Sequence, residues 1–235
     1  MQTVKNVVIA LAGRGTRLGL GKPKCLVEVN KKSLLEYQLT LLKDVENIFC
    51  VVGFLEEDVM NFAHKIRRDI IFVRNPNFQH TKTLGSFHLA ARIIDGSAIF
   101  MDGDMIIEPR SFAEFLAAAA KIDDDELLIA VSKRISDDPV YCDVENLQDK
   151  LIIRGFSYEK KSPYEWANVV YMPAKLMANG LTHTFEHLQK FLPATANIID
   201  RLEIDTPEDL RDAKNFLNVN DWFYPPRTPE ISTTN

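Results

Sequence analysis

Short runs of hydrophobic residues alternate with amphipathic segments through the first half of the chain. Val7 to Leu11 is one such run, and it predicts a buried strand. Further runs predict strands at 48–52, 70–73, 98–101 and 127–131. Between them, apolar residues recur at helical spacing and predict helices at 34–44, 56–68, 84–94 and 111–121. Strands that alternate with helices in this way predict an α/β fold with right-handed crossovers and a mostly parallel central sheet.

The pattern changes near residue 140. Residues 140–172 contain a predicted hairpin (141–153, through Asn146) and a predicted strand (163–172), and we expect them to form a small antiparallel lid over the open side of the sheet. Beyond the lid, the pattern predicts helices at 173–179, 182–192 and 207–217 and a strand at 198–204. Thr206 is the expected N-cap of the last helix. Residues 1–217 then form one domain, and 218–235 form a C-terminal tail.

Composition narrows the class of protein. The chain has 235 residues, 46% of them hydrophobic, and a net charge of −5 without a basic run, which argues against nucleic-acid binding. Its three cysteines (Cys25, Cys50 and Cys142) are widely spaced and suggest a reducing compartment. No apolar segment approaches the length of a membrane span. We therefore expect a cytoplasmic protein without a membrane partner.

Glycines and basic residues follow the first predicted strand. Gly13, Gly15 and Gly19 lie among Arg14, Arg17, Lys22 and Lys24, a composition typical of a phosphate-binding loop. The Walker A pattern is absent because Pro23 follows Lys22. The spacing of the three glycines also differs from the dinucleotide-binding fingerprint.

The string from Leu11 to Leu18, together with Pro23-Lys24, resembles the phosphate loop of nucleotidyltransferases that join an NTP to a phosphorylated small molecule. Leu11 stands where alanine is usual in that family. The resemblance implies that Leu11, Ala12, Gly13, Gly15 and Thr16 bind the nucleotide. It also implies catalytic roles for Arg17, on the β- and γ-phosphates, and for Lys24, on the charge that develops at the α-phosphate.

Two acidic motifs follow predicted strands. Asp102-Gly103-Asp104 places two carboxylates at a strand end, where they repel each other unless a cation neutralises them. The string from Glu203 to Leu210 resembles the E-I-D-T-x-E-D-L segment of the same family. The resemblance implies that Asp104 and Asp205 bind Mg²⁺ and that Asp102 lies near the ribose or the metal-bound waters. For each motif, a polar turn that caps the next helix is the alternative.

Two further segments carry candidate contacts. The segment from Thr81 to Ser86 resembles the family's base- and sugar-binding segment and implies nucleotide contacts by Thr83 and Ser86. The segment that starts at Glu165 resembles the acceptor-binding G-E-x-x-G-I segment, although Tyr164 and Asn168 replace its glycines. Acceptor binding is expected from Glu165, Trp166 and Tyr158, with aromatic rings around an alkylammonium group. Packing of these rings within the lid is an equal alternative.

The resemblance implies a three-layer, Rossmann-like sandwich. It is strongest to short cytidylyltransferases of the phosphocholine type, which implies a Mg²⁺-dependent reaction of an NTP, expected to be CTP, with a phosphate or phosphonate monoester. A sugar 1-phosphate acceptor, a non-catalytic nucleotide-binding protein and a nicotinamide-dependent oxidoreductase remain alternatives. His183 and His187 have the spacing of a metal pair, but a solvated or partly packed helix face explains them better. The base, the acceptor and a homodimer stay open.

Overall fold

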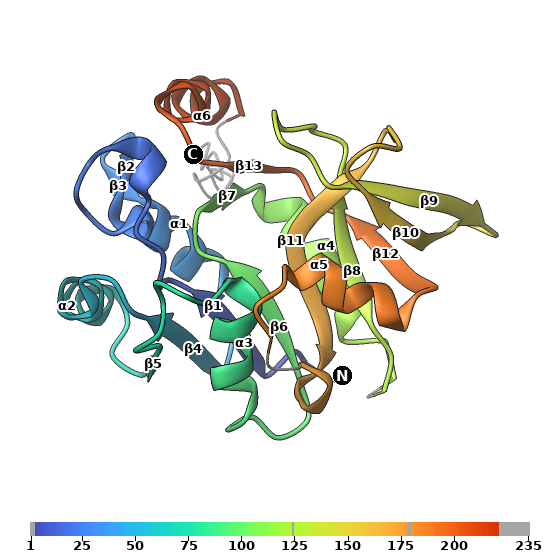
Figure 1. The fold of residues 1–235 in the computed structure, drawn as a ribbon, viewed down its shortest axis with the longest axis horizontal. Coiled ribbons are helices and arrows are strands. Elements are labelled where there is room, and N and C mark those ends of the chain that lie inside the picture. Colours follow the sequence, from blue (N-terminus) through green and yellow to red (C-terminus); the bar gives the residue numbers. More distant parts are fainter. Residues whose placement is uncertain (1–2, 124, 178–179, 221–235) are drawn as a thin grey trace, which may run out of the picture.

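A single large sheet organises the computed structural model, which describes residues 3–123, 125–177 and 180–220. In these residues the strand order is β5-β4-β1-β6-β11-β8-β12-β10-β9 (Figure 1). The strands are β1 (Asn6–Ala10), β4 (Asn47–Val52), β5 (Ile71–Arg74), β6 (Ser97–Asp102), β8 (Leu128–Ser132), β9 (Tyr141–Leu147), β10 (Lys150–Ser157), β11 (Glu165–Pro173) and β12 (Ala194–Ile198). Their pairings leave only β10 and β11, among these strands, running against the others. The predicted α/β fold with a mostly parallel sheet is confirmed.

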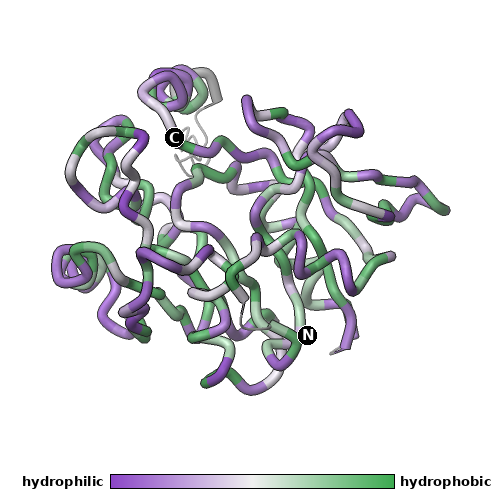
Figure 2. The backbone as a smooth tube through the Cα atoms, viewed as in Figure 1, coloured by the Kyte–Doolittle hydropathy of each residue, from purple (hydrophilic) through white to green (hydrophobic). Residues whose placement is uncertain are grey.

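Helices cover both faces of this sheet and make three layers. The first core cluster lies under α1 (Leu34–Leu41), α2 (Glu56–Ile66) and α4 (Pro109–Ala119), and the second lies under α3 (Thr83–Ala91) and α5 (Thr184–Leu188). Strand β1 feeds both clusters because its side chains alternate: Val7 and Ile9 join the first and Val8 the second. Figure 2 shows hydrophobic residues along the central strands and hydrophilic residues along the outer surfaces of α2 and α6.

The sheet changes its winding direction between β1 and β6. Strands β4 and β5 follow on one side of β1, and the chain then crosses to the other side to form β6. The loops after β1 and β6 therefore diverge, and in open α/β sheets ligands bind where loops diverge in this way. Ala10 at the end of β1 pairs with Asp102 at the end of β6, so the two motif-bearing loops start side by side.

Smaller elements complete the fold. Strand β2 (Glu28–Val29) pairs with β3 (Lys32–Ser33), and β7 (Met105–Ile107) pairs with β13 (Arg201–Glu203). Helix α6 (Pro207–Asn220) packs over a third cluster that includes Val29, Ile106 and Ile204. The described residues also contain the 3-10 helices η1 (Thr16–Leu18), η2 (Lys24–Leu26), η3 (Ala174–Leu176) and η4 (Gln189–Phe191). No helix in the described ranges is long and apolar enough to cross a membrane.

The structure differs from the sequence prediction in the second half of the chain. Strand β11, predicted in the lid, lies inside the central sheet between β6 and β8, and its residues are almost all buried. The predicted strand 198–204 is two strands, β12 and β13, in different sheets. The hairpin turns at Gln148 and Asp149, which both have positive φ, and not at Asn146. Helix α6 extends to residue 220, and 221–235 of the predicted tail lie outside the described residues.

The predicted short helices are also shorter in the structure. Only η3 forms within 173–177, and α5 with η4 replaces a continuous helix over 182–192. Thr206 caps α6 as predicted, since its hydroxyl accepts a hydrogen bond from the Asp209 N–H at 3.2 Å.

Candidate functional site

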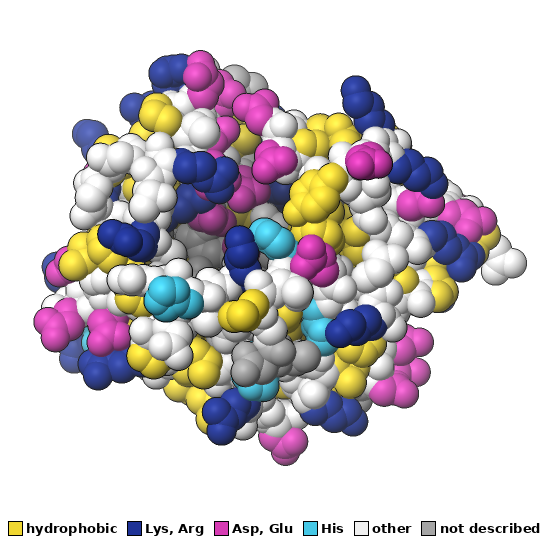
Figure 3. All heavy atoms as spheres, in the orientation of Figure 1, with side chains coloured by type: hydrophobic (Ala, Val, Ile, Leu, Met, Phe, Trp, Pro, Cys, Tyr) yellow, Lys and Arg dark blue, Asp and Glu magenta, His cyan; other side chains and the backbone are white. Residues whose placement is uncertain are grey.

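A cavity of about 490 Å³ opens at the carboxyl ends of β1 and β6. Its walls come from the loop after β1, the start of α3, the Asp102-Gly103-Asp104 turn, the segment 136–140, strand β11 and the segment 201–209. Acidic and basic side chains gather around this hollow in the middle of the face seen in Figure 3. The two loops predicted to bind phosphate and metal therefore meet at one cavity.

Three carboxylates cluster on one side of the cavity. One oxygen each of Asp104, Glu203 and Asp205 lies within 4.8 Å of the others. The pairing of β7 with β13 brings them together, because Glu203 lies opposite Met105 and the Ile204 N–H donates to the Asp104 carbonyl at 2.9 Å. Two distant parts of the chain thus converge on the arrangement predicted for Asp104 and Asp205.

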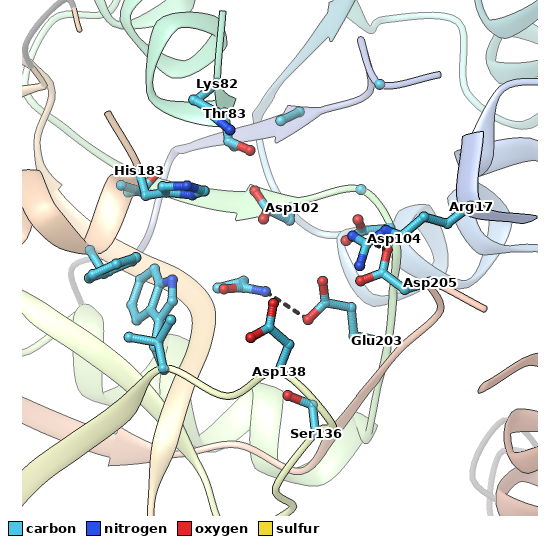
Figure 4. Close-up of a pocket in the computed structure, with 18 of the residues that line it drawn as sticks. Arg17, Lys82, Thr83, Asp102, Asp104, Ser136, Asp138, His183, Glu203 and Asp205 are labelled. Atoms are coloured by element: carbon cyan, nitrogen blue, oxygen red, sulfur yellow. Dashed lines mark hydrogen bonds and ion pairs between the residues drawn. The ribbon is translucent and has the colours of Figure 1, made fainter. Parts of the chain in front are cut away.

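Two basic side chains neutralise part of this cluster. The Lys24 Nζ lies 2.7 Å from Asp104 Oδ2 and also contacts Asp205 Oδ1. The Arg17 Nη2 lies 2.9 Å from Asp205 Oδ1, and Figure 4 shows Arg17, Asp104 and Asp205 together. Burial lowers the pKa of Lys24, but the two carboxylates outweigh burial and raise this pKa above its ordinary value.

Negative charge nevertheless remains in excess. Burial raises the pKa of Asp102 well above its usual range, and the nearby Asp104 and Glu203 add to the shift. Burial likewise raises the pKa of Glu203 to about 7, with Asp104 contributing. The Asp104 Oδ1 is buried without a hydrogen-bond partner among the described residues. A cation that binds these oxygens would relieve both the repulsion and the missing contact.

The loop after β1 places only part of its predicted contacts at the cavity. Ala12 and Gly13 line it, whereas Leu11 packs in the first core cluster. Gly15 and Thr16 also lie outside its lining. Gly15 has a φ of +59°, and a Cβ there would lie 3.0 Å from the Lys24 Cβ. The absence of a side chain at Gly15 therefore leaves room for the Lys24 side chain, outside the cavity lining.

The opposite wall is the start of α3. Thr83, Ser86 and Asp102 all line the cavity, and Figure 4 labels Thr83 and Asp102. The buried Asn75 supports this wall: its Nδ2 donates to Ser86 Oγ at 3.0 Å and to Thr81 Oγ1 at 2.9 Å. Asn75 also stabilises the turn that it begins, because its Oδ1 accepts a hydrogen bond from the Asn77 N–H at 3.0 Å.

Aromatic rings form the far end of the cavity. Tyr158 and Trp166 line it, together with Phe185, whose ring centroid lies 5.3 Å from that of Tyr158. Tyr164 does not line the cavity, and it packs against the second core cluster, to which Trp166 and Phe185 also belong. His183 also lines the cavity, but the His187 Nε2 lies 2.8 Å from the Leu176 carbonyl. The two histidine side chains therefore lie in different surroundings, which agrees with the prediction that they do not form a metal-binding pair.

Glu165 lies at the cavity with its carboxylate between Arg201 and Ser136, and its Oε1 makes no hydrogen bond among the described residues. Oε1 is 2.7 Å from the Arg201 Nη2, and Oε2 accepts hydrogen bonds from the N–H and the hydroxyl of Ser136, each at 2.9 Å. Asn168 has a φ of +58°, a conformation that suits the glycine of the resembled motif and that asparagine tolerates. Its Nδ2 donates to Glu203 Oε2 at 3.1 Å.

Sequence reasoning missed Ser136, Arg201 and Glu203 as site residues. The sequence did contain a signal for Arg201 and Glu203. Residues 201, 203 and 205 are two positions apart, so in an extended strand their side chains lie on the same face as that of Asp205. Ser136 carried no signal, since its role depends on the approach of its loop to β11.

Known proteins share this fold and parts of this sequence. The chain is 36% identical over 123 residues to the CMP-5'-(3-aminopropyl)phosphonate synthase of Streptomyces rubellomurinus, covering 49% of this chain and 19% of that protein. It is 39% identical over 70 residues to the choline-phosphate cytidylyltransferase of Streptococcus pneumoniae, covering 28% and 31%. The chain thus spans less than a third of the length of these two curated relatives.

A solved structure has a similar fold over most of this chain. The CTP:phosphocholine cytidylyltransferase of Streptococcus pneumoniae superposes with a TM-score of 0.71 at 20% identity, over 92% of this chain and 99% of that chain. The family described as MobA-like NTP transferase domain matches residues 7–153, more than half of the chain. The chain therefore belongs to the MobA-like NTP transferase family.

Proposed function

We propose that the chain is a cytidylyltransferase that transfers a nucleotidyl group from CTP to a phosphate or phosphonate monoester. The convergence of Arg17 with Asp104, Glu203 and Asp205 at one cavity carries this proposal, together with Lys24, which lies outside the lining and pairs with Asp104 and Asp205. The names of the relatives support the choice of CTP, because they describe a CMP-phosphonate synthase and cytidylyltransferases.

The reaction is an in-line displacement at the α-phosphorus. An oxygen of the acceptor's phosphate or phosphonate forms a bond to this phosphorus while the bond to the bridging oxygen breaks and pyrophosphate leaves. Such a transfer depends on positioning and on charge neutralisation, without a covalent nucleophile. Lys24 would stabilise the charge at the α-phosphate and Arg17 would hold the β- and γ-phosphates. Ala12, Gly13, Thr83, Ser86 and Asp102 would line the nucleoside.

The carboxylate cluster fits a divalent cation of the Mg²⁺ type. Asp104 and Asp205 would hold it with Glu203 close by, and the unpartnered Asp104 Oδ1 offers a ligand atom. When bound, the ion supplies positive charge beside the phosphates. The side chains of this chain then orient the two substrates around that charge.

The far end of the cavity suits an acceptor with an alkylammonium group. Tyr158 and Trp166 offer aromatic faces, and Asp137 and Asp138 line the same cavity. An ammonium group gains from the ring faces through cation–π attraction and from the carboxylates through charge. Phosphocholine and aminoalkyl phosphonates combine such a group with the attacking oxygen.

Pyrophosphate release tests the proposal directly. The protein is incubated with Mg²⁺, each of the four NTPs and a panel of phosphorylated amines, alditols and sugars. We expect release with CTP and an aminoalkyl phosphate or phosphonate. Asp104→Asn and Lys24→Ala should each lower turnover about 10²- to 10³-fold while the circular dichroism spectrum stays unchanged, because each removes a preorganised charge at the reacting phosphate.

The matched control is Asp143→Asn on β9. The Asp143 carboxylate lies outside the cavity lining and forms an exposed ion pair with Lys160, with 2.7 Å between Oδ2 and Nζ. The turnover of this variant should equal that of the unmodified chain. Near-normal turnover of Asp104→Asn or Lys24→Ala would contradict the assigned roles. The absence of release with every NTP would contradict the activity itself.

A further inference from the structure

A buried ion pair joins two walls of the cavity. The Arg201 Nη2 lies 2.7 Å from Glu165 Oε1, and the side chains of Arg201 and Glu165 are only 3% and 1% exposed. Glu165 starts β11, whereas Arg201 starts β13, two residues before Glu203. Both residues line the cavity, and their opposite charges neutralise each other, although Glu165 Oε1 makes no hydrogen bond among the described residues.

On one side, the pair holds the segment that follows β8. Ser136 donates to Glu165 Oε2 through its backbone N–H and its hydroxyl, both at 2.9 Å. Asp137 and Asp138 come next and line the cavity, where Figure 4 labels Asp138 and Ser136. An acceptor that bound Glu165 Oε2 would have to displace Ser136, and one that bound Oε1 would have to approach the Arg201 guanidinium 2.7 Å away.

On the other side, the pair holds the strand that carries the acidic cluster. The Arg201 Nη2 donates to the Trp166 carbonyl at 2.9 Å, and its Nη1 lies 3.4 Å from Glu203 Oε2. The same Glu203 oxygen accepts from Asn168 at 3.1 Å. Arg201 is therefore shared between Glu165 and Glu203, and its attraction to one limits its attraction to the other.

We propose that Glu165 and Arg201 form a positioning pair that fixes the segment 136–138 and the strand bearing Glu203 relative to each other, and that Glu165 does not bind the acceptor. This inference rests on the proposed function for its kinetic readout only. Without the Glu165 charge, Arg201 would turn to Glu203 and would compete there with a divalent cation.

A charge-balanced double variant tests the pair. Glu165→Gln should raise the KM for the acceptor roughly tenfold and weaken Mn²⁺ binding roughly tenfold, measured by titration with electron paramagnetic resonance. Adding Arg201→Met to Glu165→Gln removes both buried charges together, so most of the lost Mn²⁺ affinity should return. If Glu165 instead binds the acceptor, Glu165→Gln raises the KM without changing Mn²⁺ affinity, and Arg201→Met restores nothing; that result overturns the inference.

Ser136→Ala provides a variant that keeps the ion pair. It removes one of the two hydrogen bonds to Glu165, and we expect a rise in acceptor KM of about threefold with unchanged Mn²⁺ affinity and unchanged kcat. An unchanged KM would contradict the role of Glu165 in holding 136–138. The control is Glu145→Gln, because Glu145 accepts from Arg154 at 2.9 Å on the exposed hairpin and should change neither readout.

The readouts separate this inference from the proposed function. If the unmodified chain releases no pyrophosphate, the proposed activity fails, while the Mn²⁺ titrations still decide whether the pair controls the carboxylate cluster. If the unmodified chain is active and the double variant recovers no Mn²⁺ affinity, the positioning pair alone is wrong.

Discussion

Gly103 lets two loops approach each other where the cavity begins. Its N–H donates to the Ala10 carbonyl at 3.1 Å, and a Cβ on this residue would lie 2.6 Å from that carbonyl oxygen and 2.3 Å from Leu11 Cδ2. The Leu11 side chain could move aside, but the contact with the Ala10 carbonyl is too short for any side chain without a shift of the backbone. The carboxylates on either side of Gly103 therefore owe their position to the absence of a Cβ.

Gly103→Ala should show the consequence. We expect a loss of about 1–3 kcal/mol in the free energy of unfolding, measured by urea denaturation, because the added carbon overpacks the junction of β1 and β6. Nucleotidyl transfer should fall as well. Gly155→Ala is the control: the nearest atom to its Cβ would be 3.9 Å away, so its unfolding free energy should stay within about 0.5 kcal/mol. Equal stability of the two variants would refute the steric argument.

The hairpin of β9 and β10 turns through two residues that both have unfavourable backbone angles. Gln148 and Asp149 have φ values of +50° and +64°, a combination for which Asn-Gly is the preferred pair. Replacing them with Gln148→Asn and Asp149→Gly should raise the free energy of unfolding by about 1 kcal/mol. Thermal unfolding measures the gain, and turnover should not change because the turn lies outside the cavity lining. A lower unfolding temperature would count against this reading of the turn.

Local patterns predicted the elements of the first half of the chain because each depends on its own periodicity. Ser33, for example, caps α1 as its sequence indicates, accepting from the Glu36 N–H at 3.0 Å. The placement of β11 was not predictable in this way, since an apolar strand has the same pattern in a lid or inside a sheet. Asp104 and Asp205 were found through motifs, whereas Arg201 and Ser136 gain their roles only when β11 lies between their segments.

The whole fold should respond to the nucleotide. The cavity joins the loop after β1, the start of α3 and the segment 201–209, so a ligand that contacts all three stabilises the folded chain. At about 100 times its Kd, CTP with Mg²⁺ should add about 2.7 kcal/mol. For a chain of this size, that gain corresponds to a rise of about 5–10 °C in the unfolding temperature.

Scanning calorimetry measures this shift, with NADH as the control ligand and Asp104→Asn as the control variant. NADH should leave the unfolding temperature unchanged, and the variant should lose most of the shift with CTP and Mg²⁺. A shift with NADH and none with CTP would favour the oxidoreductase alternative.

The position of β11 also bears on how such an enzyme changes its substrate during evolution. This strand carries Trp166 at the end of the cavity proposed to bind the acceptor, yet it is hydrogen-bonded on one edge to β6 and on the other to β8. An inserted or exchanged module would have to break the main sheet on both edges. New acceptors are therefore expected to be recruited through point substitutions on this strand and through the loop before it, with the scaffold left intact.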